Sequence, residues 1–168
     1  MKDDGHSLLA WVPRLRRYAR ALSGNRDDAD DLVQDTLERA LTRSGTWAGV
    51  ADMRAWLFAI MHNVHVDGIR RPKVQTVAMD DDTPEVPVAA TQADRLAVLD
   101  LQTALEQLPA DQREILLLVG LEDLSYAEVA QTLGVPIGTV MSRLSRGRER
   151  LRALMEGRAD PVRLKVVK

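Results

Sequence analysis

The sequence contains no cysteine, which excludes a disulfide framework and any metal site built on thiolates. It also lacks an apolar run of about 18 residues, the length that a membrane-spanning helix requires. The apolar stretch 8–12 is too short for the core of a secretion signal, and Pro13 and Arg14 follow it directly. These absences predict a cytoplasmic protein with no stable membrane insertion.

Patterns typical of catalysis are equally scarce. No serine–histidine–aspartate arrangement and no glycine-rich phosphate loop is present, so we expect no catalytic residues and no cofactor. His62 and His65, with Asp67 nearby, share one face of a predicted helix and leave a metal-dependent enzyme as a rival hypothesis. A third cluster of strong ligands is missing, and we therefore predict no metal site. The chain also shows no alternation of apolar and polar residues, which indicates an all-α fold.

The most informative segment, residues 124–151, predicts a helix-turn-helix. Ser125 and Glu128 form a Ser-x-x-Glu capping box, which marks the start of a helix. Gly134 supplies a sharp turn, and Pro136 suits the first turn of a second helix. Five arginines against one acid follow between residues 143 and 152, and arginine binds phosphates and guanine edges. The pattern is typical of a DNA-reading helix, and a solvated helical hairpin is the competing interpretation.

Three amphipathic helices are predicted before this segment, at about residues 8–22, 27–41 and 52–71. Their apolar stripes include Leu41 in the second helix and Ile69 in the third. Pro72 ends the third helix. Two more helices, at about 93–107 and 110–119, precede the helix-turn-helix.

Periodicity disappears between Pro72 and about residue 91, where prolines and acidic residues dominate. Such a segment cannot bury enough apolar surface to order itself, and we interpret it as a flexible acidic linker. The expected organisation is a helical domain at 1–72, a linker at 73–92, a helix-turn-helix domain at 93–156 and a basic tail at 157–168. Whether the linker mimics nucleic acid or is a passive tether, and whether the tail is disordered or contacts DNA, stays open.

Three motifs in this order resemble the sigma-70 family in its small two-domain form, the extracytoplasmic-function (ECF) sigma factors. The first is DADDLVQDTL at 28–37, and the second is RAWLFAIMHN at 54–63, continuing to Arg71. The third begins at Leu108-Pro109 with QRE at 112–114, and continues through LSY at 124–126 and GTV at 138–140. The resemblance covers roughly residues 8–151. It implies a factor that binds core RNA polymerase and directs it to promoters.

The first motif implies the surface that docks on polymerase. Its acidic and amide side chains lie on or near one predicted helix face, opposite an apolar face, and such a face suits a protein partner; a solvated face is the alternative. The expected polymerase-binding residues are Asp31, Leu32, Gln34, Asp35, Glu38 and Arg39.

The second motif implies the helix that reads and opens the −10 promoter element. Asn63 can pair with a base edge, and the arginines can hold phosphates of a separated strand. Trp56 lies on the apolar stripe and is interpreted as a core residue more than as a stacking residue, whereas Phe58 is undecided. The expected −10 residues are Arg54, Trp56, His62, Asn63, Asp67, Arg70 and Arg71.

The third motif implies recognition of the −35 element. Met141 stands where many relatives carry a polar or basic residue, which predicts an apolar contact or an unread base at that position. The expected −35 residues are Tyr126, Thr139, Met141, Ser142, Arg143, Ser145, Arg146 and Arg148.

The expected partners are therefore core RNA polymerase, promoter DNA and an anti-sigma factor. The main alternative is a free-standing helix-turn-helix repressor or activator, which would bind its operator tightly without polymerase. The signal, the promoter sequence and the regulated genes are not specified by the sequence.

Overall fold

The computed structural model describes residues 4–43, 45, 49, 50, 52–70 and 91–157; the side chains of residues 4–7 and 70 are outside this description. These residues form seven α-helices and no strand, which confirms the predicted all-α fold. The helices are α1 (Asp4–Ser23), α2 (Arg26–Thr42), α3 (Met53–Arg70), α4 (Gln92–Glu106), α5 (Ala110–Gly120), α6 (Tyr126–Leu133) and α7 (Ile137–Met155). None of the described helices is long and apolar enough to cross a bilayer.

The helices α1, α2 and α3 pack together as the N-terminal set. The α1–α2 turn uses Gly24 in the left-handed conformation, with φ +79°. Asn25 then caps α2, because its side-chain oxygen accepts a hydrogen bond of 2.8 Å from the backbone N–H of Asp28. Tyr18 of α1 meets Phe58 of α3 edge to face, with ring centroids 4.9 Å apart. Phe58 is thus a core residue, which decides the question that the sequence left open.

The helices α4 to α7 form the C-terminal set. Thr91 and Ser125 each complete a capping box, at α4 and at α6. Gly134 follows α6 with φ +66°, as the predicted turn requires. Most of the predicted linker lies outside the described residues; its last residue, Gln92, is already the first residue of α4.

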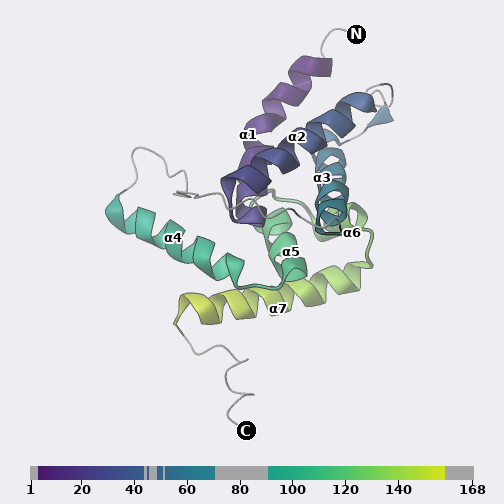
Figure 1. Ribbon diagram of the computed structural model, residues 1–168. Helices are drawn as coiled ribbons and strands as arrows, with labels where there is room; N and C mark the ends of the chain where they lie inside the picture. The colour runs from purple at the N-terminus through teal and green to yellow at the C-terminus, as the bar shows by residue number, and fades with distance from the viewer. Residues whose placement is uncertain (1–3, 44, 46–48, 51, 71–90, 158–168) are drawn as a thin grey trace.

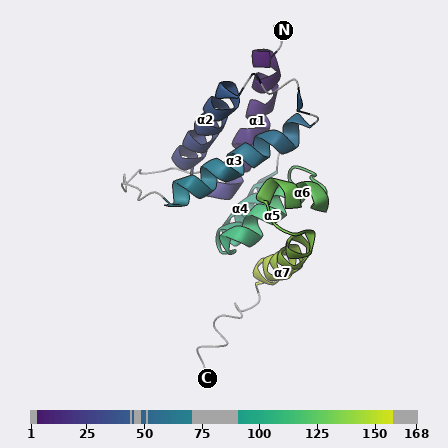
Figure 2. The same cartoon turned by 90° about the vertical axis from the view of Figure 1, so that its right-hand side faces the viewer.

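The two sets pack against each other. The N-terminal set lies above the C-terminal set in both views, with α3 next to α6 and α1 next to α5 (Figures 1 and 2). Buried residues of both sets belong to one continuous apolar cluster. Sequence patterns did not predict this packing, because no local pattern reports a contact between two amphipathic modules.

Two residues of the expected core are in fact exposed. Leu41 lies in the last turn of α2 and Ile69 near the end of α3, with 53% and 63% of their surface exposed. Both continue an apolar stripe beyond the point where a neighbouring helix covers it. Periodicity identifies the stripe but not where its cover ends.

Gly147 lies where α7 packs tightly against α5. A side chain at this buried position would place its Cβ 3.2 Å from Leu116 Cδ1 and 3.3 Å from Gln112 Cβ. Gly147→Leu is expected to lower the free energy of unfolding by about 1–3 kcal/mol, because the extra atoms overpack the contact. Gly138→Leu is the matched control, since no atom of the described residues lies within 4 Å of a Cβ at that position of the same helix. Urea unfolding of the two variants checks this prediction, and equal midpoints would contradict it.

Candidate nucleic-acid and polymerase interfaces

Helix α7 presents an exposed polar and basic face. Val140 and Leu144 are buried and anchor the helix, whereas several of the predicted −35 residues point outward. The exposed ones are Met141, Ser142, Ser145, Arg146 and Arg148, and Thr139 is half-buried. Since long polar side chains on an exposed helix can reach base edges and phosphates, this face is suited to the major groove.

Two predicted −35 residues also contact other residues of the C-terminal set. Tyr126, the first residue of α6, is half-buried and packs against the core. It also lines a groove of about 430 Å³ beside α7, together with Met141, Ser145 and Arg148. Arg143 is half-buried, and its Nε lies 3.5 Å from Asp111 Oδ2 of α5. These contacts fix both side chains at the edge of the exposed face.

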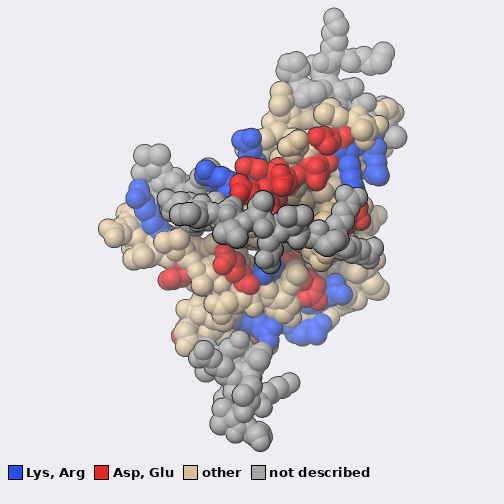
Figure 3. Space-filling model, in the orientation of Figure 1, with Lys and Arg blue, Asp and Glu red and all other residues tan. Residues whose placement is uncertain are grey.

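Helix α2 carries the predicted docking surface, which we define as Asp31, Gln34, Asp35 and Glu38. All four side chains are exposed, and acidic residues gather over α2 in the space-filling view (Figure 3). Leu32 was wrongly assigned to this surface. Only 6% of it is exposed, because it faces the core on the opposite side of α2. Its role is to hold the helix in place.

The predicted −10 residues differ in their exposure and in their contacts. Asn63 is exposed and Trp56 is half-buried against the core. Arg39, expected to contact polymerase, donates a hydrogen bond of 2.9 Å to Asp67, expected to contact DNA. This pair joins α2 to α3. The side chain of Arg70 and all of Arg71 lie outside the described residues.

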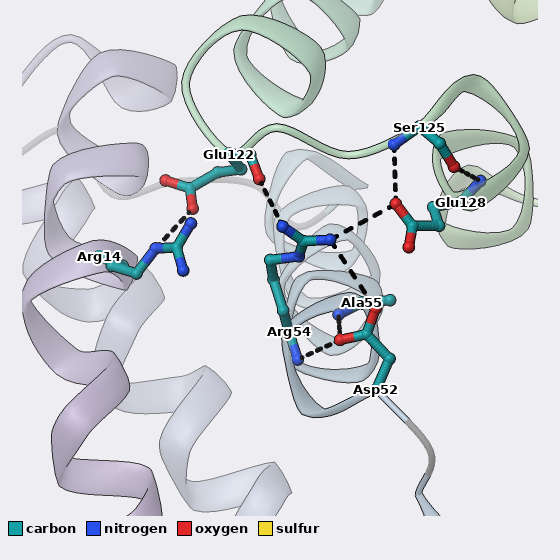
Figure 4. Close-up of polar contacts among 7 residues, drawn as sticks. All are labelled: Arg14, Asp52, Arg54, Ala55, Glu122, Ser125 and Glu128. Carbon is teal, nitrogen blue, oxygen red and sulfur yellow. Dashed lines mark hydrogen bonds and ion pairs between the residues drawn. The ribbon is translucent and has the colours of Figure 1, made fainter.

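Arg54 and His62 reach across to the C-terminal set. Arg54 Nη1 donates a hydrogen bond of 3.3 Å to the backbone carbonyl of Glu122, and Arg54 Nη2 lies 3.6 Å from the Glu128 carboxylate (Figure 4). His62 Nδ1 pairs with the Glu114 carboxylate at 2.5 Å. Two side chains predicted to contact the −10 element are therefore covered in this packed form.

Glu122 is the centre of the contact between the sets. Its carboxylate is fully buried, and Oε2 accepts a hydrogen bond of 3.1 Å from Arg14 Nε of α1. Oε1 lies 3.5 Å from Arg17 Nη2, and it forms no hydrogen bond within the described part of the chain. Arg54 shares this cluster, and its buried Nε has no hydrogen-bond partner among the residues that the structure describes. We call Arg14, Arg17, Arg54, Glu122 and Glu128 the seam cluster.

Burial raises the pKa of Glu122 above its ordinary value of 4.5, and the charges of Arg14 and Arg17 offset this only in part. A carboxyl whose pKa is raised by folding stabilises the fold most while it is protonated. That contribution is lost as the pH rises from 4.5 through the raised pKa. Tyr18, whose pKa is raised by burial and by Glu114 and Glu122, titrates far above this range.

Glu122→Gln removes this titration and keeps the shape of the side chain. The free energy of unfolding of the variant, relative to the wild type, is therefore expected to increase as the pH rises from about 4 to 7. Urea unfolding of both proteins across this range measures the difference. A difference that stays constant with pH would contradict the assignment.

Arg113 forms hydrogen bonds that connect α1, α4 and α5 where these helices meet. It donates hydrogen bonds of 3.0 Å to the backbone carbonyl of Leu22 and 2.8 Å to that of Leu105. Two more go to the carbonyls of Glu106 and Leu108. Burial lowers the pKa of Arg113, which nevertheless stays charged. The sequence motif 112–114 identified this residue but not its role, since the carbonyls that it binds come from two helix ends distant in sequence.

Both helix sets match known families. Residues 8–62 match the family model described as the Sigma2 domain of PhyR, and residues 99–151 match Sigma-70, region 4. The ECF RNA polymerase sigma factor EcfG of Rhodopseudomonas palustris is 39% identical over 158 residues, which cover 92% of this chain and 84% of the relative. SigM of Mycobacterium tuberculosis is 37% identical over 142 residues, covering 84% and 71%.

Solved structures agree over nearly the whole chain. The sigma factor RpoE of Bartonella quintana, in complex with the anti-sigma factor NepR, has a TM-score of 0.76 and 33% identity, covering 93% of this chain and 98% of that one. CnrH, in complex with the cytosolic domain of CnrY, has a TM-score of 0.68 and 26% identity, covering 93% and 89%. The chain belongs to the ECF sigma factors of the sigma-70 family.

Proposed function

We propose that this ECF sigma factor, which directs RNA polymerase to promoters, reads the −35 element with the exposed face of α7. One observation carries the proposal. The helix-turn-helix is capped and anchored to the core, and it leaves a polar and basic face exposed. Ser142, Ser145 and Arg146 reach the bases or phosphates, and Met141, half exposed, offers an apolar contact. Arg143, Arg148, Thr139 and Tyr126 support the same surface.

The docking surface of α2 contacts core polymerase in this proposal. Its acidic side chains are exposed and lie opposite the buried face of the helix. An acidic face suits a basic protein surface and repels DNA phosphates. Arg39 borders it but is engaged with Asp67.

The −10 element is read by α3, chiefly through Asn63, with Arg54, His62 and the arginines that follow. Because Arg54 and His62 are engaged by Glu122, Glu128 and Glu114, the packed form does not offer the complete surface. We propose that the packed form is inactive and that the two sets separate on polymerase. The division into domains at 1–72 and 93–156, joined by the acidic linker, permits this separation.

An anti-sigma partner belongs to this proposal. The similar structure of RpoE is of a sigma factor in complex with the anti-sigma factor NepR, and the likeness covers 93% of this chain, including both helix sets. A partner that binds both sets would favour the packed form by mass action. We further propose that the chain acts in the cytoplasm and catalyses no reaction itself.

In vitro transcription with core polymerase and the purified chain tests the function. Specific initiation from a pool of genomic promoter fragments is expected, and core polymerase alone is the control. Failure to initiate on any fragment, combined with tight binding of the chain alone to a DNA site, would instead support the free-standing repressor or activator.

A further inference from the structure

An acidic residue of α5, Asp111, lies at the edge of the predicted DNA-reading face of α7. Its Oδ2 is 3.5 Å from Arg143 Nε, and among the described residues it is the only ion-pair or hydrogen-bond partner of the Arg143 side chain. The two side chains keep 49% and 30% of their surface exposed. DNA that lies against α7 can therefore reach both members of the pair.

The packing of α5 on α7 fixes the position of this carboxylate. The two helices are in contact, and α5 lies directly above α7 in both views (Figures 1 and 2). Asp111 is in the first turn of α5, and its Oδ1 accepts a hydrogen bond of 2.9 Å from the backbone N–H of Gln112. One turn after Arg143, Gly147 lets α7 approach Gln112 closely. The carboxylate and the guanidinium are thus positioned by two packed helices and not by loops.

The ion pair leaves the terminal nitrogen atoms of Arg143 available. It is formed through Nε, and Nη1 and Nη2 form no hydrogen bond within the described part of the chain. The guanidinium is planar, so a carboxylate beside Nε restricts the direction of the remaining N–H groups. Paired N–H donors of arginine match the O6 and N7 atoms of guanine in the major groove. Arg143 can therefore read a guanine edge while Asp111 stays beside it.

A carboxylate in this place acts on DNA binding in two opposite ways. It repels phosphates, and so weakens the binding of any DNA sequence that α7 contacts. It also competes with phosphates for Arg143, and a phosphate contact carries no sequence information. Arg146 and Arg148 are exposed on the same helix and have no acidic partner among the described residues. Those two side chains can bind phosphates without leaving a carboxylate, whereas Arg143 cannot.

We propose that Asp111 is a positioning residue that determines −35 specificity, because it keeps Arg143 off the phosphates and directs its terminal nitrogen atoms to a guanine. This inference deepens the proposed function and rests on it, since α7 must lie in the major groove. Removing the carboxylate then strengthens the binding of DNA of any sequence and lowers discrimination at the base pair that Arg143 reads. A purely structural role, as a negative charge at the start of α5, predicts lower initiation on all promoters with unchanged discrimination.

The first experiment measures discrimination with the full chain and core polymerase. Single-round transcription is compared on one promoter and on its variants with each single base change in the −35 element. Arg143→Ala identifies the base pair that Arg143 reads, which is expected to be G·C. Asp111→Ala and Asp111→Asn are each expected to lower discrimination about threefold to tenfold at that pair and at no other. Asp111→Glu keeps the charge and is expected to retain most of the discrimination.

The second experiment measures general affinity. Fluorescence anisotropy of the full chain with a labelled random-sequence duplex is expected to show about twofold to fivefold tighter binding by Asp111→Ala at low salt, with the difference shrinking as salt rises. Asp100→Ala is the control in both experiments, because it removes an exposed carboxylate from α4. In an Arg143→Ala background, Asp111→Ala is expected to change no base preference, since its effect on specificity passes through Arg143.

Variants of α7 separate this inference from the proposed function. If Ser142→Ala, Arg143→Ala or Arg146→Ala changes the −35 preference but Asp111→Ala does not, the inference is overturned and the proposed function stands. An equal loss of initiation on every promoter, or weaker binding of the random duplex by Asp111→Ala, would overturn the inference in the same way. If none of the α7 variants changes the −35 preference, the proposed reading by α7 is refuted, and the inference with it. Circular dichroism verifies that each variant is folded.

Discussion

Replacing Arg146 by alanine is expected to lower initiation from a −35-dependent promoter by about tenfold to a hundredfold. Arg146 lies exposed on α7, one turn after Ser142, and its Nε donates a hydrogen bond of 3.3 Å to the Ser142 backbone carbonyl. This bond directs the guanidinium along the exposed face. A base or phosphate contact by such a side chain contributes about 1–3 kcal/mol, and about 1.4 kcal/mol is a factor of ten.

Arg95→Ala is the matched control for this variant. Arg95 is also exposed, but it lies on α4, and its loss changes the net charge equally. Single-round transcription on promoters with intact and randomised −35 elements measures the effect. The loss is expected only on the intact element if Arg146 reads a base, and on both if it binds a phosphate. Equal activities of Arg146→Ala and Arg95→Ala on every promoter would refute the assignment.

The sequence predicted those parts of the fold that depend on neighbouring residues. Ser125 and Glu128 are three residues apart, and Gly134 is a local turn, so each signal is complete within one segment. The exposed faces of α2 and α7 followed from periodicity for the same reason. Leu32 entered the docking surface through the resemblance, which marks a continuous segment of the chain, whereas the helical period places Leu32 on the opposite, apolar face.

The contacts between the two sets were not predictable in this way. Glu122 follows α5 in a short loop and has no helical partner in the sequence, yet it is fully buried between Arg14 and Arg54. Arg54 appeared only as a DNA-binding candidate, and His62 as a DNA-binding candidate or as part of the rival metal-dependent enzyme. Their acidic partners in the other set became visible only when the helices were placed in space. When a charged side chain is buried by residues that lie far away in the sequence, no local sequence pattern predicts its burial.

Glu122→Lys is expected to open the packed form. The new ammonium group would replace a buried carboxylate and face Arg14 and Arg17, so that attraction between Glu122 and these two arginines becomes repulsion. Removing one partner of a buried pair costs about 3–5 kcal/mol, and we expect roughly 2–3 kcal/mol here because Arg14 and Arg17 are partly exposed. This shifts the balance toward separated sets by about thirtyfold to a hundredfold or more.

Small-angle X-ray scattering is expected to show a larger radius of gyration for Glu122→Lys, with helicity retained in circular dichroism. Glu156→Lys, an equal charge change at an exposed residue after α7, is the control and should stay compact. Adding Arg14→Glu to Glu122→Lys restores one attractive pair and should recover part of the compactness. The opened variant should also bind core polymerase more tightly, because it no longer loses free energy to the separation of the sets. A compact, fully helical Glu122→Lys protein would show that the seam cluster does not hold the packed form together.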